Sequence, residues 1–128
     1  MIDGIEMIYQ QIADEMVSDL PAGWRQAKID AVYYPEGADY DGEYITEAGK
    51  ERSGGVTIKA TQVFDELRRK FKDAGHRVWG RATFELHSDG AFNMKWDYDN
   101  CDENGDKIWD PDEWSRQQDE RRLRLNRP

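Results

Sequence analysis

The sequence predicts a single α+β domain in which an antiparallel sheet packs against two main helices, with a short C-terminal helix. Two stretches carry apolar residues at spacings of three and four, which is typical of amphipathic helices. Other stretches alternate apolar and polar residues, which is typical of half-buried strands. The chain has 128 residues, the usual size of one domain, and no internal repeat or long linker divides it. We therefore expect one domain over residues 1–128.

The first helix is predicted over residues 2–20. Its apolar stripe comprises Ile5, Ile8, Ile12, Met16 and Leu20. The pair Leu20-Pro21, followed by Gly23, is a typical end of a helix. The outer face is acidic and carries no Lys or Arg.

Three strands are expected next, over about 24–34, 39–46 and 56–59. The first alternates small or apolar residues with charged ones and stops at Pro35. The second follows a short turn, and a polar loop rich in glycine separates it from the third. The run Val56-Thr57-Ile58 is β-branched, which favours a brief strand.

A second helix is predicted over 61–74, with Thr61 as its cap and Gly75 at its end. The basic residues of its later turns suit the negative end of a helix dipole. A last, mostly polar helix is predicted over 111–125, because Asp110-Pro111 is typical of a helix start.

The centre of the chain is predicted to be a hairpin over 78–98. Phe84 and Leu86 alternate with polar residues before the turn, as do Phe92, Met94 and Trp96 after it. A three-residue loop closed by a left-handed Gly90 keeps the apolar side chains on one face. The expected pairs are Leu86 with Phe92, Phe84 with Met94, Ala82 with Trp96, Thr83 with Lys95 and Arg81 with Asp97. We expect the two longer helices to cover this apolar face.

Composition excludes several classes of protein. Five Trp, six Tyr and four Phe argue against disorder, and no apolar run reaches the length of a membrane span. The net charge of -9 argues against nucleic-acid binding, which needs Lys and Arg, and favours a basic protein partner. One cysteine, Cys101, and the lack of a visible secretory signal indicate a cytoplasmic location.

Metal and catalytic sites are not predicted. Asn100, Asp102, Asn104 and Gly105 resemble the start of a calcium loop, but Pro111 stands where the loop needs a bidentate Glu. An acidic turn is the preferred interpretation. Cys101 lies among acids, which oppose thiolate formation. We therefore expect no cofactor, no metal and no enzymatic activity.

The charge pattern is the informative feature. The acidic segment, residues 97–113, carries eight acids and one Lys, interleaved with aromatics. Such a surface suits docking onto a basic protein, although it could equally be a solubilising face. The predicted contact residues are Asp97, Tyr98, Asp99, Asp102, Glu103, Asp106, Trp109, Asp110, Asp112 and Glu113. The alternative contact is Asp39, Asp41 and Glu43, within a second acidic run at 36–47.

An ordered set of segments resembles the YezG-like antitoxin and immunity-protein family. The set comprises residues 8–13, Leu20-Pro21, Trp24, residues 64–68, Phe71, Trp79, residues 83–86, 88–92 and 97–99. The resemblance covers roughly residues 5–100; the segment 36–58 and the tail after Asn100 depart from it. It implies an α+β protein that neutralises a co-produced toxin, often a nuclease, by binding it. It carries over no binding residue.

The function predicted from the sequence is therefore that of a bacterial immunity protein. The alternative is an acidic adaptor domain without inhibitory action. A small hydrolase using carboxylates or Cys101 is a third interpretation, which no motif supports.

Overall fold

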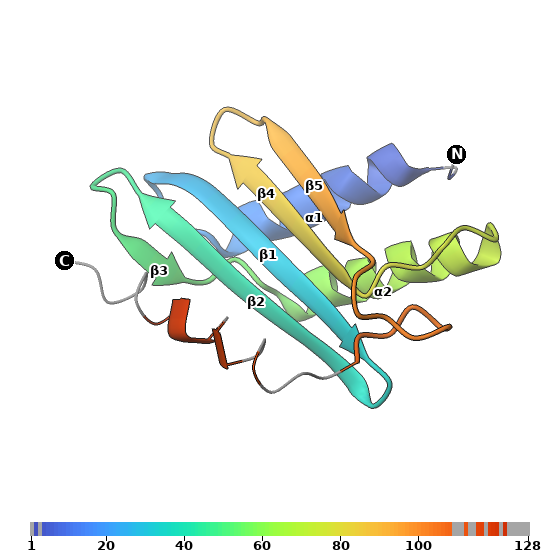
Figure 1. Ribbon diagram of the computed structural model, residues 1–128. Helices are drawn as coiled ribbons and strands as arrows, with labels where there is room; N and C mark the ends of the chain where they lie inside the picture. Colours follow the sequence, from blue (N-terminus) through green and yellow to red (C-terminus); the bar gives the residue numbers. More distant parts are fainter. Residues whose placement is uncertain are drawn as a thin grey trace.

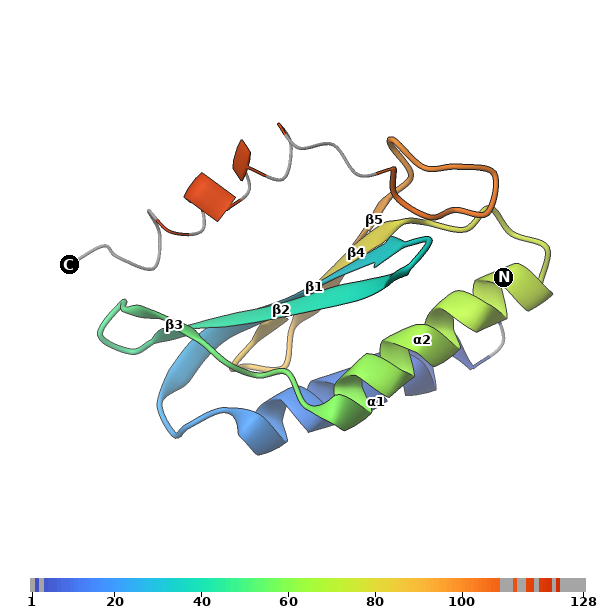
Figure 2. The same cartoon turned by 90° about the horizontal axis from the view of Figure 1, so that it is seen from below.

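The computed structural model describes residues 2, 4–108, 112, 115, 116, 118–120 and 122. An antiparallel sheet in the order β3-β2-β1-β4-β5 packs against two helices, which lie on the same face of the sheet (Figures 1 and 2). The elements in chain order are α1 (Ile5–Asp19), β1 (Trp24–Tyr34), β2 (Gly37–Thr46), β3 (Glu51–Ser53), α2 (Ile58–Asp73), β4 (Arg81–His87) and β5 (Phe92–Asp97). The predicted α+β class is confirmed.

The central hairpin has the predicted register. Leu86 pairs with Phe92, Phe84 with Met94 and Ala82 with Trp96, and the polar pairs follow on the other face. Gly90 adopts a φ of 94°, the left-handed conformation that a three-residue loop requires. The local sequence pattern was sufficient to predict this register, because a shift of one residue would have placed every apolar side chain on the solvent-facing side of the hairpin.

The core lies between the sheet and the two helices. It contains the apolar stripes of both helices and the inward residues of β1 and β4, among them the fully buried Ile29, Phe64 and Phe84. The prediction that the helices cover the whole hairpin face was wrong at one end. Phe92 is 50% exposed because β5 is an edge strand, although it contacts Tyr9 of α1 at a ring distance of 5.5 Å. Met94 and Trp96 are partly buried.

The predicted strand at 56–59 does not form, and α2 begins earlier than the predicted 61. Thr57, not Thr61, is the N-cap: its hydroxyl accepts a hydrogen bond from Ala60 N at 3.0 Å. The same hydroxyl donates to Glu15 of α1 at 2.8 Å, which ties the start of α2 to α1. A single capping hydrogen bond therefore outweighs the β-propensity of three residues that have no strand beside them.

The third strand is instead β3, within the stretch predicted to be a loop. Its residues are polar, and it is held by backbone pairing to β2, such as Ile45 with Glu51. After β3 the chain passes close to Gly42 of β2. A Cβ at Gly42 would lie 2.4 Å from the carbonyl oxygen of Gly54, so this position needs glycine.

The C-terminal residues that the structure describes are helical at 112, 115, 116, 118–120 and 122. They form the short C-terminal helix, on the side of the sheet opposite α1 and α2 (Figure 2). The two ends of the predicted helix 111–125 lie outside the described residues. At the other terminus, α1 is shorter than the predicted 2–20, because Gly4 precedes its first turn as the N-cap.

Candidate protein-binding surfaces

The acidic segment begins in β5 and continues as a compact loop over residues 98–108. The loop is closed by a bridge between Cys101 and Lys107 and by a hydrogen bond from Ile108 N to Asn100 O at 2.8 Å. It is fixed to the sheet by a hydrogen bond from Lys107 N to Tyr33 O at 2.6 Å. The segment is therefore part of the folded domain as far as residue 108.

Three of the predicted contact residues hold this loop together. Asp97 forms an ion pair with the buried Lys107 at 3.2 Å, and Asp106 forms one with Arg68 of α2 at 2.8 Å. Asp102 accepts hydrogen bonds from the backbone N–H groups of the residues at 104 and 106, at 2.9 and 3.0 Å. These carboxylates stabilise the fold, and their charges are partly compensated within the protein.

The other seven predicted contact residues differ in their exposure, and three of them lie outside the described residues. Asp99 and Glu103 are exposed, and Asp112 is exposed in the C-terminal helix. Tyr98 is partly buried beneath the guanidinium of Arg77, 4.9 Å from its ring centroid. Trp109, Asp110 and Glu113 lie outside the described residues. Contact with a partner remains a prediction for all ten.

Tyr33 and Tyr40 form a cluster that is connected to the loop through Arg68. Tyr33 of β1 donates a hydrogen bond to Asp65 of α2 at 2.7 Å, and Tyr40 of β2 donates to the same carboxylate. Burial, followed by these hydrogen bonds, raises the pKa of Tyr40 to about 12 and raises the pKa of Tyr33 further. The guanidinium of Arg68 lies 4.5 Å from the Tyr33 ring centroid, so it connects this cluster to Asp106 of the loop.

The geometry of the loop bears on the calcium site and on the Cys101 nucleophile that were considered from the sequence. Asp102 directs one carboxylate oxygen at backbone N–H groups, and no cluster of three His, Cys, Asp or Glu side chains suited to a metal occurs in the part of the chain that is described. Burial is the main cause that raises the pKa of the Cys101 thiol, with Lys107 opposing it. The thiol is therefore protonated at neutral pH and is a poor nucleophile.

A second surface is the face of the sheet opposite α1 and α2, which we call the open face; the described C-terminal helical residues lie on the same side of the sheet (Figure 2). Strand alternation and register direct Asp39, Asp41 and Glu43 of β2 onto this face, where Glu43 lies opposite Lys28 of β1. Glu85 of β4 lies on the other side of Lys28. We call Asp39, Asp41, Glu43, Glu51 and Glu85 the acidic open face. The cations described on the same face are Lys28 at its centre, Arg81, which pairs with Asp30, and Lys95 of β5, so acids outnumber them.

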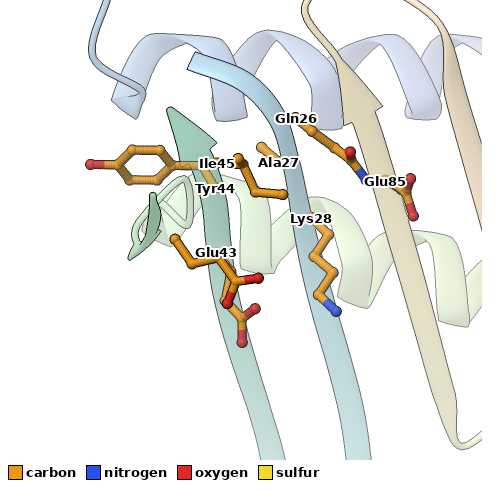
Figure 3. Close-up of a pocket in the computed structure, with 8 residues that line it drawn as sticks. Gln26, Ala27, Lys28, Glu43, Tyr44, Ile45 and Glu85 are labelled. Carbon is orange, nitrogen blue, oxygen red and sulfur yellow. Dashed lines mark hydrogen bonds between the residues drawn. The ribbon is translucent and has the colours of Figure 1, made fainter. Parts of the chain in front are cut away.

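A hollow of about 160 Å³ lies in this face, where β3, β2, β1 and β4 run side by side (Figure 3). It is lined by Gln26, Ala27, Lys28, Glu43, Tyr44, Ile45, Glu51 and Glu85. Glu43 is only 8% exposed, and Glu85 accepts a hydrogen bond from Gln26 at 2.6 Å. The Oε2 atom of Glu51 is buried and has no hydrogen-bond partner among the described residues.

Comparison with known families identifies the chain. The family described as immunity protein YezG-like matches residues 5–117, which is most of the sequence. The chain belongs to the YezG-like immunity protein family. The match includes the segment 36–58 and extends beyond Asn100, so the two regions that departed from the resemblance lie within the family's span. No curated protein sequence matches the chain.

Membership of the YezG-like immunity proteins indicates a toxin protein as partner in general terms. The structure adds Glu85 and Glu51 to the alternative contact surface of Asp39, Asp41 and Glu43, and the sequence pattern missed Glu51 because it stands in a stretch predicted to be a loop. The pairing of Glu51 with Ile45 could not be seen from polar residues alone. None of the helices in the described part of the chain is long and apolar enough to cross a bilayer.

Proposed function

We propose that this YezG-like protein binds a cognate polymorphic toxin domain directly and neutralises it in the bacterial cytoplasm, as one half of a toxin–antitoxin pair used in competition between bacteria. The toxin is proposed to be a nuclease, and the immunity protein acts by binding rather than by catalysis. Its partner is a protein with a basic surface, not a nucleic acid or a membrane.

The observation that carries the proposal is the accumulation of acids on a face that the core does not use. The acidic open face and the exposed Asp99 and Glu103 contribute to the net charge of the whole chain, which is -9. A nuclease binds a polyanion, so its active site is basic, and an acidic protein can cover it. Charge of opposite sign also speeds the encounter of the two proteins.

Co-expression tests the function. The toxin domain encoded next to the immunity gene is expressed alone and together with this protein, and growth is scored. Growth arrest by the toxin, rescue by the protein and a complex in gel filtration are expected. A complex without rescue would instead favour the acidic adaptor, and rescue without any complex would contradict neutralisation by direct binding.

The nuclease class has its own test. The purified toxin domain is incubated with plasmid DNA and total RNA, with and without an equal amount of the immunity protein. Degradation of either nucleic acid that stops when the immunity protein is added is expected. A toxin that leaves both intact while still arresting growth would exclude a nuclease and leave immunity in place.

The part played by charge can be separated from the fold. Asp102 and Asp106 are unsuitable for charge reversal because they hold the loop, whereas Asp99 and Glu103 are exposed. The variant Asp99→Lys/Glu103→Lys should slow association with the toxin at low salt by about tenfold and leave stability unchanged, if the loop faces the toxin. The matched reversal of Asp39, the exposed acid of β2, reports on the open face. A slower rate for Asp39→Lys alone would place the contact on the sheet.

A further inference from the structure

The hollow in the open face contains an unsatisfied acceptor. No donor among the described residues reaches the buried Oε2 atom of Glu51, and Glu43, another lining residue, is 8% exposed. A buried polar atom without a partner normally costs about 1–3 kcal/mol, and such atoms are uncommon in folded proteins. The sheet therefore holds a carboxylate in a place where a donor from outside would improve its environment.

The walls of the hollow define the kind of donor. Three lining residues are carboxylates, Glu43, Glu51 and Glu85, against the single cation Lys28. Ile45, the cross-strand partner of Glu51, supplies apolar surface. The volume of about 160 Å³ is roughly ten times the space that one water molecule needs, so a side-chain head group can enter. A cation with an apolar stem meets these conditions.

Among protein cations, a guanidinium suits this geometry better than an ammonium. Its five N–H donors are arranged in a plane and can serve two carboxylates at once, whereas the lysine ammonium is a compact and strongly hydrated charge. Glu51 of β3 and Glu43 of β2 lie on adjacent strands of the sheet, so one planar group can span these two carboxylates, whereas Glu85 of β4 lies beyond β1.

We infer that the hollow receives the guanidinium group of an arginine side chain presented by the toxin. The inference rests on the proposed function and specifies the chemistry of the partner at this surface. The strands hold the hollow in place before binding, so little conformational entropy is lost when the arginine enters.

Glu51→Gln tests the inference, because it keeps the size of the side chain and removes its charge. Affinity for the toxin domain identified by growth rescue should fall at least tenfold, mainly through faster dissociation. The midpoint of thermal unfolding should stay equal or rise, since the variant removes the charge from a carboxylate whose buried Oε2 atom has no donor among the described residues. The matched control is Glu66→Gln, an exposed residue of α2 on the other side of the sheet, which should bind within twofold of the wild type.

Several outcomes would overturn the inference. Wild-type affinity in Glu51→Gln would exclude the hollow from the interface, while rescue by the wild-type protein would still support immunity. A loss of binding that accompanies a lower unfolding midpoint would assign Glu51 a structural role. Failure of the wild-type protein to bind the toxin would reject the proposed function itself.

A small-molecule titration tests the hollow without the toxin. L-arginine amide should shift the NMR signals of the Gln26 side chain and the Glu51 backbone in a saturable manner at millimolar concentration, and L-lysine amide should shift them less. Glu51→Gln should abolish the response. Equal responses to both amides would contradict selection of a guanidinium.

The protein's own arginines are a rival occupant. Residues 116–127 contain Arg116, Arg121, Arg122, Arg124 and Arg127. In the full chain with these five changed to Gln, the toxin should bind with unchanged or slightly higher affinity. A response to L-arginine amide that appears only in this variant would show that the C-terminal segment fills the hollow, and would overturn the assignment to the toxin.

Discussion

Replacement of Arg68 by Met should remove the contacts that connect α2 to the loop over residues 98–108 and should destabilise the protein. The side chain of Arg68 is 11% exposed; it pairs with Asp106, donates to Trp79 O at 3.1 Å and lies over the Tyr33 ring. A hydrogen bond from a charged donor contributes about 1.5–3 kcal/mol, and a partly desolvated cation–π contact contributes about 1 kcal/mol. The Asp106 carboxylate, 18% exposed, would also lose its partner. We expect a loss of about 3–4 kcal/mol in the free energy of unfolding.

Urea unfolding followed by tryptophan fluorescence measures this loss, since Trp79 lies beside the altered side chain. A double-mutant cycle with Asp106→Asn isolates the ion pair, and its coupling energy should be about 1–2 kcal/mol. A matched control is Arg69→Met, an exposed neighbour on α2. Additive effects of the two substitutions, or a loss below about 1 kcal/mol for Arg68→Met, would refute this account of how the loop is held.

Three further predictions concern the sheet and the tyrosine cluster. Phe84→Ala should destabilise the protein by about 3–5 kcal/mol and Phe92→Ala by less than half of that, because the second ring is 50% exposed; urea unfolding of both variants would show it, and equal losses would contradict the edge position of β5. Gly42→Ala should lower the unfolding midpoint strongly, since its methyl group would meet backbone 2.4 Å away, and a neutral effect in calorimetry would disprove the close approach. The free energy of unfolding should fall as pH rises above about 10, where the unfolded chain loses phenolic protons that Tyr33 and Tyr40 retain in the fold. Unfolding at pH 9 and 11 should show a smaller fall in the double Phe variant of these tyrosines, and an equal fall would exclude the cluster as the cause.

The hairpin and both long helices could be predicted from the sequence because their signals are local. Alternation in β4 and β5 determines which residues face each other, and the helical stripes identify what covers them. The strand at 56–59 was predicted wrongly for the same reason: local β-propensity took no account of the hydrogen bond between Thr57 and the start of α2. Strand β3 escaped prediction because backbone pairing, rather than side-chain pattern, holds it.

The two candidate surfaces could likewise be predicted only as far as their signals are local. The acids of the segment 97–113 were visible as charges, but the partner of Asp106 is 38 residues away in the sequence. Only the folded chain shows that Asp97, Asp102 and Asp106 are used internally. The hollow depends on four strands that meet in the sheet, so neither its shape nor the unsatisfied oxygen of Glu51 has a local signature.

The alternation along β1 has a consequence for how such a protein can evolve. Ala27, Ile29 and Ala31 belong to the core, whereas Gln26 and Lys28 between them face the open side. A substitution of Gln26 or Lys28 alters the open face and leaves core packing untouched, because neighbouring side chains point in opposite directions. Where the toxin binds the open face, as proposed above, a lineage can follow a diversifying toxin by single substitutions at these positions without first acquiring spare stability.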